Sequence, residues 1–247
     1  IEDPYYEQNS LKCEWVSNRW WVYETTFCCQ PPQTGRTFLT FKGIDYEAVF
    51  FLNGQKIGEH KGMYIPCRLD VTHLIQEQNF LLVVLKNAPE EMGQIGLTSQ
   101  TSTQKARFGY KWDFSTRLVD LGLYDEVFVE HVGLCEIKEP QIRVADAQGG
   151  VVKVTASLPA VAPCEAVCTL TVRFDGKEIL RQEQKMALPQ GENAYQAQCV
   201  IPEPQLWYPN GYGQQPLYEV CLQVQDRAGS DSYTAMVGLR TLSYEQA

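Results

Sequence analysis

The chain has 247 residues, of which 44% are hydrophobic and 21% are charged. This length fits two ordinary domains, and the composition supplies enough apolar mass for two cores. The net charge of −9, from 21 basic and 30 acidic residues, argues against a nucleic-acid partner and against an anionic membrane surface. Both of those partners attract clustered Lys and Arg, whereas a neutral sugar needs no basic patch. No apolar run reaches the ~20 residues of a membrane-spanning helix.

The cysteine count bears on the compartment and on metal binding. There are nine cysteines, an odd number, in a chain too large to depend on disulfides for its stability. This count favours free thiols and a cytoplasmic location, although the chain begins at Ile1 and shows no signal peptide, so its N-terminus leaves the localisation unknown. Cys164 and Cys168 are four residues apart, with no CxxC pair or nearby His, so no metal site is predicted. No cofactor is predicted either.

The first half of the chain is expected to be all β. Short runs rich in β-branched and aromatic residues recur between Gly, Pro, Asn and Asp, and helical periodicity is almost absent. Asn53-Gly54 predicts a type I′ hairpin, the apolar run 80–85 predicts a strand covered on both faces, and the polar residues 89–104 predict a long loop. The expected strands are 21–27, 36–41, 46–52, 55–58, 80–85, 107–110 and 123–130.

The second half is expected to form a separate β-sandwich. A domain boundary is predicted near residues 133–140, which gives domains of 1–134 and 135–247. Asp175-Gly176 predicts another hairpin, and about seven short strands over ~110 residues predict an immunoglobulin-like architecture. These strands are expected at 141–145, 151–158, 167–174, 178–186, 194–201, 217–225 and 232–237.

Three segments share their order and spacing with a known family. They are Ile1–Asn9 with Trp15 and the run 21–27, then residues 51–66 with Asp70-Val-Thr72 and Asn79, and finally Leu206–Tyr218 with its Trp207-Tyr208-Pro209-Asn210-Gly211 core. Together they resemble glycoside hydrolase family 2, in its β-mannosidase branch, over essentially the whole chain. The resemblance implies a galactose-binding-like jelly-roll β-sandwich at 1–134, followed by the immunoglobulin-like β-sandwich at 135–247.

The resemblance also implies what lies outside these two domains. The family usually has a first strand before the point matched by Ile1, so that strand is either missing from the jelly roll or present upstream of the sequence shown. The family also has a (β/α)8 barrel that carries the catalytic glutamates after the second sandwich, whereas this sequence stops at Ala247. The implied partners are that barrel, as part of the same parent chain, and a carbohydrate, a β-mannoside or related sugar.

Catalytic residues are not expected within the chain itself. A retaining glycosidase needs two carboxylates ~5–5.5 Å apart. Glu90-Glu91 are adjacent in the expected loop, and Asp125-Glu126 are expected to point to opposite faces of a strand. The three histidines, His60, His73 and His131, complete no Ser/His/Asp arrangement, and no nucleotide-binding glycine loop is evident. The chain alone is therefore predicted to be inactive.

The candidate substrate-binding residues are Trp112 and Asp113. The segment Lys105–Phe114 is similar to one that ends in Trp-Asp-Trp in β-mannosidases and exo-glucosaminidases, where its loop reaches into the mouth of the barrel. The resemblance implies that Asp113 accepts hydrogen bonds from sugar hydroxyls while Trp112 shapes the pocket. Phe114 replaces the second Trp of the motif and Lys111 replaces a Gly. Local sequence alone favours Trp112 as a core anchor and Asp113 as a turn residue, and the resemblance reverses that preference.

Other aromatic residues and several functions compete with this interpretation. Trp20, Trp21 and Trp207 are expected in the core rather than as sugar platforms, and Arg240 is either solvated or bonded to the barrel. The leading function is sugar recognition and spacing within a β-mannosidase-like hydrolase. The alternatives are a stand-alone carbohydrate-binding module, part of a β-galactosidase- or β-glucuronidase-type enzyme, and a ligand-free structural pair of sandwiches.

Overall fold

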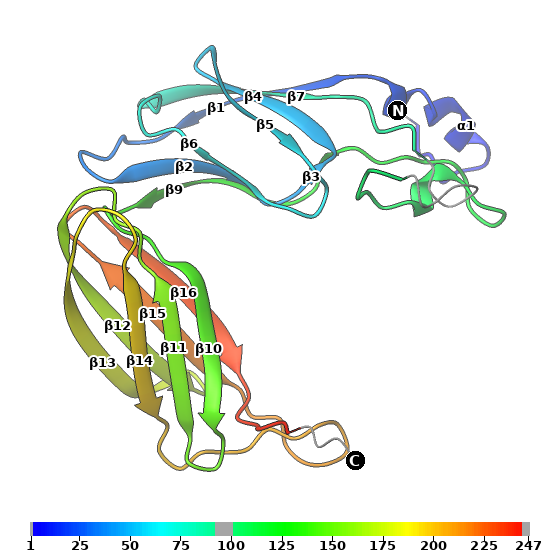
Figure 1. Ribbon diagram of the computed structural model, residues 1–247. Helices are drawn as coiled ribbons and strands as arrows, with labels where there is room; N and C mark the ends of the chain where they lie inside the picture. Colours follow the sequence, from blue (N-terminus) through cyan, green and yellow to red (C-terminus); the bar gives the residue numbers. More distant parts are fainter. Residues whose placement is uncertain (1, 92–100, 244–247) are drawn as a thin grey trace. The chain divides into compact units, whose positions relative to one another are not determined.

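The structure is a computed structural model that describes residues 2–91 and 101–243. The chain divides into two compact units, Ile1–Pro32 with Thr37–Glu130, and Gln33–Arg36 with His131–Ala247. Strands dominate both units, and the described helices are short: α1 (Asn9–Cys13), η1 (Val16–Asn18) and η3 (Phe108–Tyr110) (Figure 1). The predicted all-β class is confirmed. In the described ranges, no helix has both the length and the apolar character to cross a membrane.

The first unit contains two main antiparallel sheets. One sheet has the order β1-β7-β4-β5 and the other has the order β6-β2-β9 (Figure 1). The short strands β3 and β8 form a separate pair. The strands are β1 (Trp21–Cys28), β2 (Arg36–Phe41), β3 (Ile44–Asp45), β4 (Glu47–Leu52), β5 (Gln55–Lys61), β6 (Cys67–Asp70), β7 (Gln78–Leu85), β8 (Gly122–Leu123) and β9 (Val127–Val132).

Alternating apolar residues from these strands form the core of the first unit. Phe41 of β2 and Phe50 of β4 are fully buried with ring centroids 4.5 Å apart, a separation at which aromatic pairs attract. Val83 and Leu85 of β7 belong to the same cluster. The predicted hairpin between β4 and β5 is confirmed, since Asn53 and Gly54 have φ values of 52° and 83°, as a type I′ turn needs.

Several local predictions for the first unit are wrong. Strand β7 alternates between buried and exposed residues, and Phe80 is 41% exposed, because an apolar run alone does not reveal which face is covered. Residues 107–110 form no strand, since Phe108–Tyr110 are the 3-10 helix η3, in which the Tyr110 amide bonds to the Arg107 carbonyl at 3.0 Å. The run 123–130 is interrupted at 124–126, so Asp125 and Glu126 lie outside a strand.

Trp20 also departs from its expected place in the core. Its side chain is 62% exposed, and its indole N–H donates to Asn87 Oδ1 at 3.1 Å. Its neighbour Trp21 packs against the core as expected. Residues 89–91 and 101–104 of the predicted loop contain no helix or strand, whereas residues 92–100 lie outside the described residues.

The second unit is a sandwich of one three-stranded and one four-stranded sheet. The orders are β10-β11-β14 and β13-β12-β15-β16, and all of these pairings are antiparallel (Figure 1). The seven predicted strands are confirmed, with ends that shift by a few residues. They are β10 (Lys138–Asp146), β11 (Val151–Ser157), β12 (Cys164–Phe174), β13 (Lys177–Leu188), β14 (Ala194–Val200), β15 (Tyr218–Gln225) and β16 (Ser230–Val237).

The core of the second unit follows directly from strand alternation. Val152 and Val154 of β11 share one apolar cluster with Leu170 and Val172 of β12, and all four side chains are fully buried. The predicted hairpin at Asp175-Gly176 is confirmed between β12 and β13, and the φ values of 48° and 76° fit a type I′ turn. Each sheet thus buries one side-chain face, as two-layer sandwiches do.

Candidate functional site

Trp112 and Asp113 lie in a tight turn on a lobe of the first unit. We call residues 101–121 the lobe; it leads directly into β8. Trp112 and Ser115 exchange two backbone hydrogen bonds of 3.4 Å, which places Asp113 and Phe114 at the tip. Phe114 is 83% exposed, Asp113 is exposed and Trp112 is partly exposed, with its ring 6.4 Å from that of Phe114.

The side chain of Asp113 has no partner in the described part of the chain. No hydrogen bond or ion pair to its carboxylate forms within residues 2–91 and 101–243. An ionised carboxylate offers about four acceptor positions, and all of them are open here to a ligand or to water. The tip therefore presents an acceptor and two aromatic rings to solvent, which are the groups that bind a pyranose by its hydroxyls and its C–H face.

A buried ion pair holds the base of the lobe. The Lys105 ammonium contacts the carboxylate of Asp45 in β3 and donates to the Asp120 carbonyl at 2.6 Å. The two charged side chains are only 2% and 3% exposed. Burial raises the pKa of Asp45, and the hydrogen bond from Lys105 opposes that rise. This pair joins both ends of the lobe, through Lys105 and Asp120, to the strand beside the core.

Tyr110 and Gly109 fix the middle of the lobe. Tyr110 is 2% exposed, its hydroxyl donates to the Pro89 carbonyl, and burial raises its pKa to about 12. Leu118 donates its amide to the Gly109 carbonyl at 2.8 Å. A Cβ at Gly109 would lie 2.3 Å from the Leu118 carbonyl oxygen, so the two segments of the lobe approach too closely for any side chain there.

Glu91 and Arg107 close the other side of the lobe. The Glu91 carboxylate accepts hydrogen bonds from the amides and hydroxyls of Ser102 and Thr103 at 2.7–3.0 Å. These bonds, led by those from the two hydroxyls, lower the pKa of Glu91 to about 2. The Arg107 guanidinium contacts the carbonyls of Glu91 and Thr103. Glu91 thus has a structural role, because it ties the segment that follows β7 to the start of the lobe.

The buried carboxylates of the described residues are also structural. They are Asp45, Glu136 and Asp226. Glu136 binds Arg36 at 2.7 Å and Lys138 at 3.3 Å, and Asp226 accepts hydrogen bonds from backbone amides. Each is occupied by a partner of the opposite charge or by N–H donors, so none is poised as a nucleophile or acid for glycoside cleavage.

Sequence reasoning missed the anchors of the lobe. Lys105 and Asp45 are 60 residues apart, and nothing in their local sequence marks them as partners. A lysine at the start of a motif-bearing segment was the single available signal. Arg240, by contrast, has a partner within the described residues, since its guanidinium lies over the Trp207 ring, 4.7 Å from the centroid.

The fold defines the class of protein, a galactose-binding-like jelly roll followed by an immunoglobulin-like sandwich. Residues 1–125 match the family model described as glycosyl hydrolase 2 galactose-binding domain-like, and residues 136–240 match glycosyl hydrolases family 2. The chain therefore belongs to glycoside hydrolase family 2, and the predicted family and fold class are confirmed.

Individual β-mannosidases are similar to this chain in sequence and structure. Beta-mannosidase B of Thermothelomyces thermophilus is 28% identical over 260 residues, covering 97% of this chain and 30% of that protein. Beta-mannosidase B of Aspergillus terreus is 29% identical over 272 residues, covering 100% of this chain and 31% of its own length. The crystal structure of beta-D-mannosidase from Dictyoglomus thermophilum is similar with a TM-score of 0.83 at 26% identity, covering 98% of this chain and 32% of that one. The chain thus spans about a third of the length of these relatives.

Proposed function

We propose that this chain is the sugar-recognising, non-catalytic N-terminal part of a β-mannosidase. The named relatives support this proposal, since two are called beta-mannosidase B and the similar crystal structure is a beta-D-mannosidase. The matched region covers 30–32% of each of them. The cleavage chemistry is accordingly assigned to the part of the full-length protein that lies outside this region, and the two sandwiches supply recognition and spacing.

The observation that carries the proposal is the open carboxylate of Asp113 on a rigidly anchored tip. Buried Lys105 and Tyr110 hold the lobe, so the tip is positioned without using Asp113 as a structural group. We assign to Asp113 the acceptance of hydrogen bonds from two hydroxyls of the terminal sugar. Charge-assisted hydrogen bonds are roughly twice as strong as neutral ones, which makes such a contact selective for the orientation of the hydroxyls. Trp112 covers the apolar side of the ring.

The test is the Asp113→Ala variant in the full-length protein. We expect kcat/KM on an aryl β-mannoside to fall at least about tenfold, equivalent to ~1.4 kcal/mol of transition-state binding. The matched control is Asp120→Ala, because Asp120 is an exposed acid of the same lobe whose carbonyl, rather than its carboxylate, holds Lys105. An unchanged kcat/KM for Asp113→Ala would make Asp113 a turn residue and remove the proposed contact.

Two further measurements separate the competing functions. The isolated 247-residue chain is expected to hydrolyse no aryl glycoside and to show no saturable binding of mannose or mannobiose up to tens of millimolar. Millimolar or tighter binding by the chain alone would instead support a stand-alone carbohydrate-binding module. A full-length protein that prefers a β-galactoside or β-glucuronide over a β-mannoside would contradict the mannosidase assignment while leaving the family unchanged.

A further inference from the structure

The second unit brings together two cysteines that are distant in sequence. The sulfurs of Cys135 and Cys164 and a carboxylate oxygen of Asp226 all lie within 4.8 Å of one another. The sequence directs attention to Cys164 with Cys168, four residues on, but the fold places Cys135 beside Cys164. Cys135 forms a β-bridge with Ala160, so its segment runs antiparallel to the residues that lead into β12 at Cys164.

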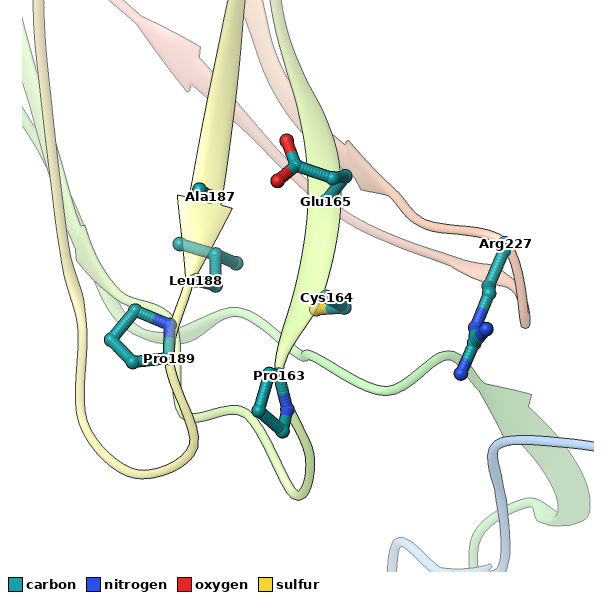
Figure 2. Close-up of a pocket in the computed structure, with 7 residues that line it drawn as sticks. All are labelled: Pro163, Cys164, Glu165, Ala187, Leu188, Pro189 and Arg227. Atoms are coloured by element: carbon teal, nitrogen blue, oxygen red, sulfur yellow. The ribbon is translucent and has the colours of Figure 1, made fainter.

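The two thiols differ in access. Cys135 is 1% exposed, whereas Cys164 is partly exposed and lines a cavity of about 560 Å³. Figure 2 shows Cys164 between Pro163 and Glu165 on the wall of this cavity, with the Arg227 side chain among its lining residues. A small molecule in the cavity therefore meets Cys164 first, and Cys135 behind it.

Asp226 has a structural part in this cluster. Its Oδ2 accepts hydrogen bonds from the amides of Leu134 and Cys135 at 2.6 and 3.0 Å, and its Oδ1 accepts from Ala228 and Gly229 at 2.7 and 3.1 Å. Four N–H donors occupy the carboxylate, which leaves two sulfurs as available ligands. Structural zinc uses four protein ligands and catalytic zinc uses three, so the cluster favours chemistry between the sulfurs over zinc binding.

We propose that Cys135 and Cys164 form a redox-active dithiol, which a small-molecule disulfide entering the cavity converts into an intramolecular disulfide. The Cys164 thiol loses its proton, and its sulfur attacks one sulfur of the small disulfide. That S–S bond breaks, and a first small thiolate leaves and takes up a proton. The Cys135 thiol then loses its proton and attacks the Cys164 sulfur, which releases the second small thiolate. Two protein thiols are oxidised and one small disulfide is reduced to two thiols.

The geometry supports this order of events. A disulfide needs sulfurs about 2.05 Å apart, so one side chain must rotate, and Cys164 has the open cavity beside it. Burial, together with the charge of Asp226, raises the pKa of both thiols, while the hydrogen bond with Cys135 and the charge of Arg227 partly oppose that rise at Cys164. Because the thiolate is the attacking form, the reaction is expected to be slow at neutral pH and to start at Cys164.

The test uses the reduced 247-residue chain, equilibrated with oxidised glutathione and then treated with a maleimide. Peptide mass spectrometry is expected to show a Cys135–Cys164 cross-linked peptide, in which neither cysteine carries the maleimide or a glutathione. The variant C135S should stop at a glutathione adduct on Cys164, and C164S should leave Cys135 unmodified in the folded state. The matched control is C221S, since Cys221 is another partly exposed thiol of the same unit and its loss should leave the cross-link intact.

Three outcomes would overturn the proposal. They are the lack of any Cys135–Cys164 peptide at equilibrium, a persistent glutathione adduct on Cys164 of the unsubstituted chain, and equimolar Zn²⁺ retained by both thiols of the reduced chain. The peptide map of the unsubstituted chain decides the matter even if C135S fails to fold. As a second measurement, oxidation is expected to raise Tm by several degrees in the unsubstituted chain and in C221S but in neither of the other variants.

Discussion

The lobe of the first unit and the sandwich of the second unit are stabilised in different ways. The sandwich buries alternating Val, Leu and Tyr side chains between two sheets, so its stability comes from many similar apolar contacts. The lobe is built around a 3-10 turn and one isolated β-bridge, and its small apolar cluster consists of Ala88, Tyr110 and Val119.

Polar contacts hold the lobe in place, whereas apolar packing holds the sandwich together. Lys105, Tyr110, Arg107 and Glu91 each bond to partners that lie between 4 and 60 residues away. A single lost polar partner leaves a buried group unsatisfied, whereas a single lost apolar contact leaves a cavity of limited size. The comparison teaches that an exposed tip can be held firmly outside regular sheets, provided that a few specific pairs stay intact.

The largest expected effect comes from breaking the buried ion pair. Lys105→Met leaves the Asp45 carboxyl without its cation, and we expect a loss of about 3–5 kcal/mol in the free energy of unfolding. Urea denaturation measures this loss, and hydrogen exchange of the lobe amides should rise most. The double variant Lys105→Met, Asp45→Leu is expected to recover much of it. If Lys105→Met alone costs under about 1 kcal/mol, polar anchoring of the lobe is refuted.

The matching change in the sandwich is Leu170→Ala. Leu170 is fully buried at the centre of β12, so the lost transfer energy and the resulting cavity should cost about 3 kcal/mol. Hydrogen exchange should rise in β12 and β15, the strands paired there. The control is Leu242→Ala, because Leu242 is 64% exposed and should change stability by less than about 0.5 kcal/mol. Equal effects of the two variants would contradict the assigned core.

A smaller effect concerns the pH dependence of the lobe. The pKa of Glu91 is lowered to about 2 from its ordinary value of 4.5, so its ionised form is favoured by folding. Its contribution is complete above pH 4.5 and is lost as the pH falls through about 2. NMR signals of the Ser102 and Thr103 amides should therefore stay constant down to about pH 3 and then shift. Glu91→Gln should abolish this transition, and Glu90→Gln should leave it in place.

The smallest expected effect is that of Asp113→Ala on stability. Since Asp113 bonds to nothing in the described residues, its removal should change the free energy of unfolding by less than about 0.5 kcal/mol. Thermal and urea denaturation of the isolated chain measure this. An unchanged free energy of unfolding would show that the tip residue Asp113 does not stabilise the lobe, in contrast to the anchors Lys105 and Tyr110. A loss above about 1.5 kcal/mol would show that Asp113 is itself one of the anchors.

Much of the second unit could be predicted from sequence because its information is local. Strand alternation has a period of two, and Asp175-Gly176 specifies its hairpin by allowing positive φ at both positions. In the first unit the same signals located β2 and the Asn53-Gly54 turn. They were wrong at 107–110, a run that looks like a strand but in which tertiary contacts of Tyr110 stabilise a 3-10 turn.

The sequence by itself determined the all-β class, the two hairpins and the family, since these depend on short-range patterns and motifs. Only the tertiary structure decided that Lys105 meets Asp45, that Trp20 is exposed and that Cys135 adjoins Cys164. The paired residues are far apart in the chain. From the sequence, each lysine could pair with any of many acids, and each cysteine with any of the other cysteines. The packing of the folded chain selects one pair, because only in the folded chain do those two side chains come within bonding distance.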